Sequence, residues 1–389
     1  MLFSLGGLKL ENNHIVKYSD KKFKFIEVFN TLTGEYIRSG ILKDGKDTNI
    51  DPFMRSFPGL LDIGIMGGCK AASKGLCRAG GSISGCYQGA RKYDPQKDMR
   101  LDDYKSIIDE GKENGLMQVA LGGAGNPNDH QYFKEICEYT RSKNIVPNYT
   151  TSGIDLTDDA VAATKMYCGA VAVSWYYQKF TVDAIKKFID AGCKTNIHFV
   201  LSKETIDDAI KLLEKHILPW KDDKKYIYNF KENPINAFIF LLYKPVGLGK
   251  IDNTLTLEHD SKKIHKFFSL IAKEHPFKIG FDSCSIPAIV NFSEDIDENS
   301  IDTCEGGRFS AYISADMHMM PCSFDQDMKW GVDLRNHTLK EAWESEQFND
   351  FRSSLMHSCI NCDKRMICMG GCPIKHEIVL CDRKEKYKK

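Results

Sequence analysis

The sequence has no excess of charge of either sign, because its 389 residues include 53 Lys or Arg and 53 Asp or Glu. A balanced chain lacks the basic surface that attracts duplex nucleic acid or an anionic membrane, so we expect neither partner. Its strongest apolar run, "AFIFLLY" (237–243), is far shorter than the ~20 residues of a membrane-spanning helix. The opening "MLFSLGGLKL" lacks the basic start and sustained apolar core of a signal peptide. We therefore predict a soluble, cytoplasmic protein.

Cysteine is absent before Cys69, although the chain contains 14 in all. In a reducing compartment these thiols are not expected to pair as disulfides, and clustered ones are better explained as metal or redox ligands. Three of them, Cys69, Cys77 and Cys86, lie in the glycine-rich stretch "IMGGCKAASKGLCRAGGSISGCYQG" (65–89). Eight more follow residue 283, so the cysteines form two groups with a long stretch between them.

Residues 1–60 are predicted to be a small β-rich extension. Within it, "KFKFIEVFN-TLTG-EYIRSGI" (22–41) alternates apolar and polar residues on both sides of a turn, as a β-hairpin does. We assign the extension a packing role and no chemistry.

Between residues 61 and 283, short apolar strands alternate with amphipathic helices, a pattern typical of a parallel sheet. A helix is expected at 101–115 and another at 204–216, each with one apolar face. Six β-α units are too few for an eight-stranded barrel, so the pattern predicts a partial barrel or an open doubly wound sheet. The expected strands are 60–66, 116–121, 144–149, 170–175, 195–201 and 235–243.

Unusual residues follow the expected strands one after another. Cys69 follows the first, "GGAGNP" (122–127) the second, "TTSG" (150–153) the third, and "KPVGLG" (244–249) the sixth, while Ser174 ends the fourth. The carboxyl ends of parallel strands are the face on which barrels and open α/β sheets assemble their sites. We therefore expect the first three cysteines at the mouth of the sheet.

Three thiolates can hold three irons of a [4Fe–4S] cluster and leave the fourth iron available to another ligand. The spacing C-x7-C-x8-C is not a standard ferredoxin run, so three unrelated core cysteines are an alternative. Zinc is a rival, but a three-thiolate zinc site usually has a nearby His or fourth Cys, and the loop contains none.

The alternation of strands and helices stops near residue 284, and the rest of the chain is predicted to be a domain held mainly by metal. Its most specific stretch, "CINCDKRMICMGGCP" (359–373), reads C-x2-C-x5-C-x3-C and is followed by Cys381. Packing does not explain five thiols so close together. The cysteines of this region are Cys284, Cys304, Cys322, Cys359, Cys362, Cys368, Cys372 and Cys381.

On these motifs the chain resembles a radical S-adenosylmethionine enzyme with a C-terminal SPASM domain. That family's pattern is C-x9–15-G-x4-C, then C-x2-C-x5-C-x3-C, then a final Cys. The second part matches throughout, and the first matches at Cys304 and Cys322, with Met317 where glycine is expected. The resemblance implies a partial (β/α)6 TIM-type barrel at 61–283, the N-terminal β extension at 1–60 and an iron–sulfur SPASM domain at 284–389.

The resemblance also implies three [4Fe–4S] clusters. Cys69, Cys77 and Cys86 would hold the one that binds S-adenosylmethionine. The distal auxiliary cluster would be held by Cys359, Cys362, Cys368 and Cys381. The proximal one would be held by Cys304, Cys322 and Cys372, and its fourth ligand is either Cys284 or a position open to substrate; a buried strand-end thiol is the other reading of Cys284. Cys137, Cys168 and Cys193 are expected in the core.

The radical domain departs from the family in two motifs. The usual C-x3-C-x2-C loop is longer here, and the usual G-G-E is Gly122, Gly123 and Ala124. Glycines still let a backbone approach a ligand closely, although "GGAGNP" also fits a plain turn. By resemblance the cofactor would meet Gly122, Gly123, Ser152, Ser174 and Gly247.

The resemblance implies an oxidoreductase that modifies a ribosomally made precursor peptide by hydrogen abstraction and formation of a thioether, carbon–carbon or carbon–heteroatom crosslink. Its partners would be that peptide and an electron donor such as flavodoxin or ferredoxin; the peptide's leader could be held by the predicted hairpin or by a separate protein. One alternative is a formylglycine-forming, sulfatase-type maturase, although the acid expected after the second SPASM cysteine is Ser323 here, with Asp325 nearby. The other is a non-catalytic iron–sulfur electron carrier, which has no need of an open iron.

Overall fold

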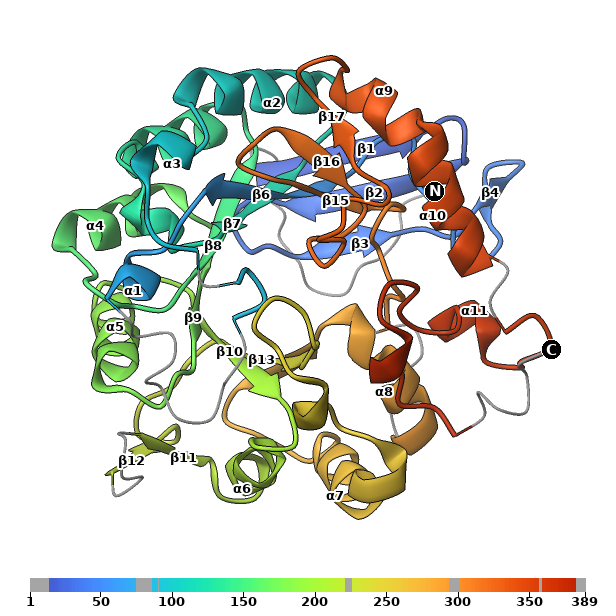
Figure 1. Cartoon of the computed structure of the whole chain (residues 1–389). Helices are drawn as coiled ribbons and strands as arrows, with labels where there is room; N and C mark the ends of the chain where they lie inside the picture. Colours follow the sequence, from blue (N-terminus) through green and yellow to red (C-terminus); the bar gives the residue numbers. More distant parts are fainter. Residues whose placement is uncertain are drawn as a thin grey trace.

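The computed structural model describes residues 14–74, 86–89, 91–220, 226–293, 301–356 and 359–382 (Figure 1). A ten-stranded sheet in the order β14-β13-β10-β9-β8-β7-β6-β15-β16-β17 forms its centre. From β6 to β14 the neighbours are parallel and follow chain order, as in a barrel wound in one direction. These strands are β6 (Leu60–Met66), β7 (Gln118–Gly123), β8 (Val146–Thr151), β9 (Val171–Ser174), β10 (Thr195–Leu201), β13 (Ala237–Leu242) and β14 (Lys278–Phe281).

The predicted partial barrel is confirmed, and a doubly wound sheet is excluded by the strand order. Each of the six expected strands overlaps an observed one. The parallel strand β14, "KIGF", is not among the expected strands, because four residues are too few for their apolar period to stand out from the surrounding sequence.

Helices cover the outside of the barrel (Figure 1). In α2, the apolar residues Tyr104, Ile107 and Ile108 lie on one face and are buried. Helix α6 likewise buries apolar residues of one face, namely Ile206, Ala209, Ile210 and Leu213. The helices of this part are α1 (Lys70–Ser73), α2 (Leu101–Glu113), α3 (Phe133–Ser142), α4 (Asp158–Tyr167), α5 (Lys179–Asp190), α6 (Ile206–Lys215), α7 (Leu257–Leu270) and α8 (Ile286–Phe292). A small hairpin of β11 (Ile217–Trp220) and β12 (Tyr226–Asn229) follows α6.

The C-terminal part adds strands to the same sheet. Strand β15 (Ser310–Ile313) pairs in parallel with β6, and β16 (His318–Met320) and β17 (Val332–Asp333) continue antiparallel. Met317, in the turn before β16, has a φ of +64°. Glycine adopts this left-handed conformation at no steric cost, which explains why the family pattern expects glycine there. The remaining helices are α9 (Leu339–Glu344), α10 (Glu346–Met356) and α11 (Arg365–Cys368).

The N-terminal extension contains the predicted hairpin, in which β2 (Phe25–Asn30) pairs with β3 (Tyr36–Arg38). Strand β1 (Ile15–Asp20) adds a third antiparallel strand, and β4 (Leu42–Lys43) and β5 (Lys46–Asp47) form a short second hairpin.

The predicted domain boundaries at residues 60/61 and 283/284 remain predictions. In the described part of the chain, no helix combines the length and apolar character needed to span a bilayer.

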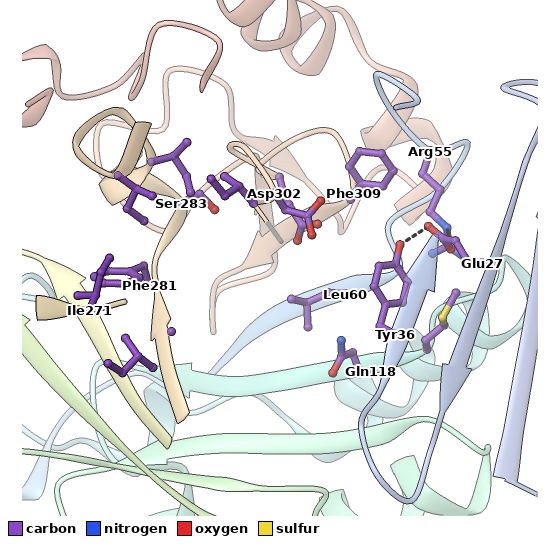
Figure 2. A pocket seen from close by; sticks show the side chains of 18 of the residues that line it. Glu27, Tyr36, Arg55, Leu60, Gln118, Ile271, Phe281, Ser283, Asp302 and Phe309 are labelled. Carbon is purple, nitrogen blue, oxygen red and sulfur yellow. Dashed lines mark hydrogen bonds and ion pairs between the residues drawn. The ribbon is translucent and has the colours of Figure 1, made fainter. Parts of the chain in front are cut away.

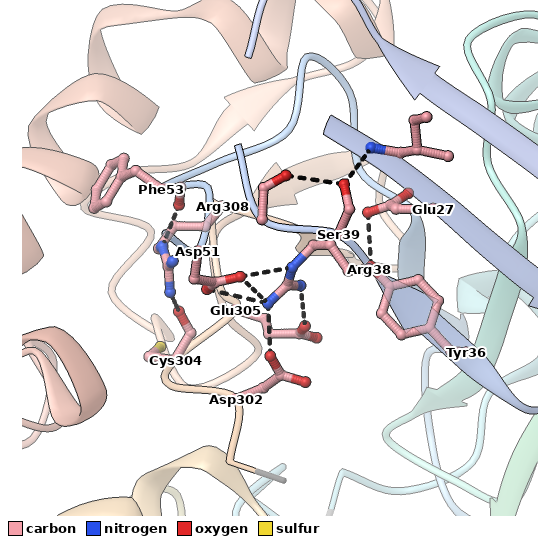
Figure 3. A network of polar contacts seen from close by, with 12 residues as sticks. Glu27, Tyr36, Arg38, Ser39, Asp51, Phe53, Asp302, Cys304, Glu305 and Arg308 are labelled. Atoms are coloured by element: carbon pink, nitrogen blue, oxygen red, sulfur yellow. Dashed lines mark hydrogen bonds and ion pairs between the residues drawn. The ribbon is translucent and has the colours of Figure 1, made fainter. Parts of the chain in front are cut away.

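Two arginines of this extension contact other parts of the chain, and Arg55 does so by donating from Nη2 to the Gly115 carbonyl at 2.9 Å. Arg55 Nε lies 2.9 Å from Glu27 Oε2, with both side chains at most 1% exposed. Arg38 bonds Asp51 and, at 2.6 Å, the Asp302 carboxylate (Figure 3). These contacts fix β2 and β3 against the segment that leads into β15.

Replacing Arg55 by Met should lower the free energy of unfolding by about 3–5 kcal/mol, because Glu27 would remain as a buried, unpaired charge. Adding Glu27→Gln should recover part of that loss, so the double variant should be less destabilised than the sum of the single variants. Urea unfolding followed by tryptophan fluorescence measures both effects. The exposed pair Lys179–Asp183 is the control: Lys179→Met should cost less than about 1 kcal/mol. Equal effects at Arg55 and Lys179 would contradict the prediction.

Candidate functional site

Two cysteines of the predicted triad lie at the carboxyl end of β6. Cys69 precedes α1, its amide donates to the Arg91 carbonyl at 2.9 Å, and it interacts electrostatically with the Cys86 thiol. Burial raises the pKa of the Cys69 thiol, while the amides of Ala72 and Ala71 oppose that shift. Cys77 lies outside the described residues.

The predicted glycine loops pack directly against these two cysteines. A Cβ atom at Gly125 would lie 2.3 Å from the Gly68 carbonyl oxygen and 3.2 Å from Cys69 Cα. Gly247 has a φ of +62°, and a Cβ there would lie 2.5 Å from the Cys86 carbonyl oxygen. The loops after β7 and β13 therefore form walls around the cysteine loop, as the order of motifs predicts.

The two adjacent glycines Gly122 and Gly123 have different environments. Gly123 has a φ of +113°, and a Cβ would meet the Met66 carbonyl oxygen at 2.5 Å, so the fold itself requires glycine. A Cβ at Gly122 would meet nothing within 4 Å. Gly122 thus has free space beside a backbone that a ligand can approach.

The two predicted serines lie at neighbouring strand ends. Ser152 follows β8, and its amide donates to Asn126 Oδ1 at 2.8 Å. Ser174 is the last residue of β9 and is half-buried. Both lie on the same rim of the barrel as Gly122.

The barrel interior is polar. Asp62 lies on β6 opposite Tyr312 of β15, and burial raises the pKa of its carboxyl to about 6. The Tyr312 hydroxyl extends over Gly64, where a Cβ would lie 2.5 Å from it. Across the interior, His198 Nδ1 lies 3.4 Å from Thr150 Oγ1, and burial lowers the His198 pKa to about 4. The histidine is therefore neutral at neutral pH.

A buried ion pair connects β13 and β14. Lys244, 7% exposed, pairs with Asp282 and donates to the Leu242 carbonyl at 2.8 Å. Burial alone would lower the Lys244 pKa, but the negative charges of Asp282 and nearby groups raise it by more than burial lowers it. The amine therefore stays protonated. Its ammonium also lies 4.8 Å from the centre of the Phe324 ring and interacts with Cys284 and Cys322.

Four C-terminal cysteines share one neighbourhood next to this pair. The thiols of Cys284 and Cys372 are hydrogen-bonded to each other. Burial raises the pKa of Cys304 to about 11, and nearby Cys284 adds to the shift. Burial raises the pKa of Cys322 still more, with further contributions from Cys284 and Cys304. The three predicted proximal ligands are thus together, with Cys284 beside them.

The four predicted distal ligands form a second group. Burial raises the pKa of Cys368 to about 11, and Cys381, Cys359 and Cys362 each contribute to the shift. These four cysteines therefore lie near one another, and their role as ligands of one cluster stays a prediction.

The chemistry of both sets fits iron–sulfur clusters. Buried thiols with raised pKa values are neutral at neutral pH, whereas metal ligands must be thiolates, and a bound cationic centre supplies the charge that makes thiolates stable. The described residues contain no group of three or more His, Cys, Asp or Glu side chains placed to hold a single metal ion. An iron–sulfur cluster does not need such a group, because each of its thiolates binds a different iron and the ligands lie farther apart.

The other cysteines lie in the helical layer. Cys137 of α3 is fully buried, and its Sγ is 3.7 Å from that of Cys168, which ends α4. Cys193 follows α5 and packs against the core. All three are placed as expected.

Comparison with known proteins agrees with this arrangement. Residues 304–363 match SPASM, an iron–sulfur cluster-binding domain, which confirms the resemblance. The crystal structure of Streptococcus suis SuiB bound to S-adenosylmethionine superposes with a TM-score of 0.67 at 17% identity, over 95% of this chain and 98% of SuiB. The chain has the fold of SuiB.

SuiB bound to its precursor peptide SuiA gives the same TM-score at 16% identity, over 92% of this chain and 94% of that one. Native anSMEcpe with bound AdoMet and the Cp18Cys peptide gives a TM-score of 0.59 at 17% identity, over 83% of this chain and 92% of that one. No curated protein sequence matches the chain.

Sequence reasoning missed the charged groups of the interior. Asp62 and His198 were within expected strands, and a charged or titratable side chain inside an otherwise apolar strand is a usable signal. Lys244 was noted only as part of a turn. Asp282 gave no signal, because β14 was not recognised.

Gly122→Ala should leave the free energy of unfolding within about 0.5 kcal/mol of the original and weaken S-adenosylmethionine binding about tenfold, because the added methyl group fills the free space. Gly123→Ala, the matched control, should instead lose about 2 kcal/mol or more of stability, since it needs a positive φ. Equilibrium dialysis and urea unfolding separate the two effects. Unchanged cofactor binding by Gly122→Ala would argue against the site.

Asp62→Asn should raise the free energy of unfolding at pH 7 by about 2 kcal/mol. The folded-state pKa of about 6 lies above the ordinary 3.8, so ionising Asp62 costs stability as the pH rises through this interval. The difference between variant and original should vanish below about pH 4, where the carboxyl is protonated in both states. Urea unfolding between pH 4 and 7 measures it. A difference independent of pH would contradict this account.

Proposed function

We propose that the protein is a radical S-adenosylmethionine enzyme that modifies a ribosomally made peptide by hydrogen abstraction and crosslink formation. The observation that carries the proposal is that Cys69 and Cys86 lie together at the carboxyl end of β6, while eight further cysteines gather in two neighbourhoods in the C-terminal part. A plain electron carrier needs the second feature but not the first. The superposition on SuiB and anSMEcpe, both of which were solved with peptides, supports a peptide substrate.

In this proposal Cys69, Cys77 and Cys86 hold the cluster that binds the cofactor. S-adenosylmethionine and its cluster, when bound, supply the power to remove a hydrogen atom from an unactivated carbon. Gly122 gives the cofactor a close approach to the backbone, with Gly123, Ser152, Ser174 and Gly247 forming the rest of its surroundings.

The interior positions the substrate. Neutral His198, Thr150 and the Tyr312 hydroxyl offer hydrogen bonds without adding charge, and Asp62 has a pKa high enough to exchange a proton near neutral pH. Burial of these groups keeps water away from the reacting carbon.

The two auxiliary cysteine sets would accept the electron released as the product forms. Cys284, hydrogen-bonded to Cys372, is the better candidate for the fourth proximal ligand than a position open to substrate. The protonated Lys244 next to this set offsets part of its negative charge. A flavodoxin or ferredoxin in the cytoplasm is the proposed electron donor, and a thioether or carbon–carbon or carbon–heteroatom crosslink is the proposed product.

The sulfatase-type alternative is less well supported. Its expected acid is Ser323 in this chain, and the nearby Asp325 is already engaged: its carboxylate accepts from the amides of Lys329 and Trp330 at 3.1 and 2.9 Å. Asp325 therefore organises its own loop.

The function is tested by reconstituting the protein anaerobically, reducing it, adding S-adenosylmethionine and measuring 5′-deoxyadenosine. We expect its formation, with more iron bound than one cluster holds. Iron binding without 5′-deoxyadenosine would favour the electron carrier.

Replacing Cys69, Cys77 and Cys86 together by Ala should abolish 5′-deoxyadenosine formation and remove about a third of the iron, because the auxiliary sets are unchanged. Cys193→Ala is the matched control and should change neither value, since this thiol lies in the outer layer. Iron analysis and chromatography of the product give the result. Retained cleavage in the triple variant would refute the assignment of the triad.

A further inference from the structure

Lys244 brings a positive charge next to the predicted proximal cysteines. The residue comes just after β13, and its side chain is 7% exposed. Its ammonium lies 4.8 Å from the centre of the Phe324 ring, and Phe324 is two residues after Cys322. The ammonium also interacts electrostatically with Cys284 and Cys322. A buried cation therefore accompanies the cysteines of this neighbourhood, which are Cys284, Cys304, Cys322 and Cys372.

The Lys244 side chain is held at two points. It donates to the Leu242 carbonyl at 2.8 Å and pairs with the Asp282 carboxylate. Asp282 is itself fixed, because its carboxylate accepts from the Leu242 amide at 3.2 Å and from the Ser285 hydroxyl at 2.8 Å. The ammonium therefore stays beside the cysteines instead of extending into solvent.

A large cavity near β14 does not reach this ion pair. The cavity measures about 710 Å³, and Phe281 and Ser283, the chain neighbours of Asp282, line it (Figure 2). The described residues that line it do not include Asp282 or Lys244. Solvent in the cavity therefore has no contact with the pair, and charges away from solvent are screened much less than exposed ones.

Asp282 does not cancel the positive charge at the cysteines. Its carboxylate is 17% exposed and shares its charge among three donors, namely the ammonium, an amide and a hydroxyl. The hydrogen bond to Cys372 and burial raise the pKa of Cys284; Lys244 opposes them, and its effect is larger than that of Asp282. Burial raises the pKa of Cys322, and Lys244 opposes this shift too. The positive end of the pair therefore faces the cysteines.

Such a charge changes how readily a cluster at this place is reduced. One-electron reduction adds one negative charge to the cluster and its thiolates. A nearby cation stabilises the added charge more strongly in a buried site than in water. Net charge, hydrogen bonds and exposure are the factors that set the potential of an iron–sulfur cluster. A cluster held by the proximal cysteines would thus be easier to reduce with Lys244 than without it.

We propose that Lys244 raises the reduction potential of the iron–sulfur cluster held by the proximal cysteines, and so favours this cluster as the acceptor of the electron released when the product forms. The inference rests on the proposed function for the presence of the cluster and for the source of the electron. Lys244 acts through the cluster and is a positioning residue for charge, while Asp282 holds the ammonium in place.

The test is an anaerobic redox titration of the reconstituted holoenzyme, followed by electron paramagnetic resonance. The cluster of the cysteine loop is identified by the change in its signal when S-adenosylmethionine is added, and the distal cluster by the loss of its signal in Cys368→Ala. Lys244→Met should lower the ratio of reduced to oxidised proximal cluster about tenfold at a given potential, which is a midpoint shift of about 59 mV to more negative values. The distal midpoint should stay the same. An unchanged proximal midpoint, or an equal shift of both midpoints, would overturn the proposal.

Two further variants separate charge from structure. Lys244→Arg keeps the charge and should return most of the lost shift, which a purely structural role would not require. Lys244→Met leaves Asp282 buried without its cation, so the double variant Lys244→Met/Asp282→Asn removes both charges. Its proximal midpoint should lie between those of Lys244→Met and the original protein. A double variant with the original midpoint would show that the pair is neutral toward the cluster and would overturn the proposal.

Lys329→Met is the matched control. Lys329 lies in the loop that follows Cys322, but it is exposed, so water screens its charge and the proximal midpoint should not move measurably. A shift as large as that of Lys244→Met would assign the effect to the general charge of the protein and overturn the proposal.

Formation of 5′-deoxyadenosine by the original protein reports separately on the proposed function. Its absence together with a midpoint that depends on Lys244 would count against the proposed function alone. Its presence together with a midpoint that does not depend on Lys244 would overturn this inference alone.

Discussion

The arrangement of the C-terminal part depends on one constraint, the cost of burying cysteines that must be thiolates. Burial raises the pKa values of Cys304, Cys322 and Cys368, so each would be a neutral thiol in a metal-free protein. Around the predicted distal ligands the only α-helix in the described residues is α11, which has four residues. A bound cluster would thus stabilise both the thiolates and the fold that gathers them.

The cysteine loop of the barrel follows a different logic. There the loops after β7 and β13 approach the backbone of Cys69 and Cys86 so closely that Gly125 and Gly247 have no room for a side chain. Such packing fixes the backbone of the cysteine loop, whereas the space next to the Gly122 backbone is not filled by other atoms. Rigid walls beside free space suit a site that must position an added ligand, whereas the C-terminal sets enclose theirs.

The sequence was most informative for features whose signal lies within a short stretch of residues. Cysteine spacing carried the resemblance to the SPASM family, and the β-α alternation predicted the partial barrel, because each signal is local. Long-range features gave no such signal. Strand β14 is too short to show a period, so the ion pair of Asp282 with Lys244 and the free edge of the sheet were invisible. Met317 stands where the family pattern has glycine. The structure accounts for this difference, because Met317 adopts the positive φ that the turn requires.

The N-terminal extension, predicted to have only a packing role, contacts the C-terminal part next to one of the predicted proximal ligands. Arg38 of β3 bonds Asp302, and Arg308 bonds the carbonyls of both Phe53 and Cys304, at 2.5 and 3.0 Å (Figure 3). The extension therefore holds the backbone of a proximal cysteine through two arginines.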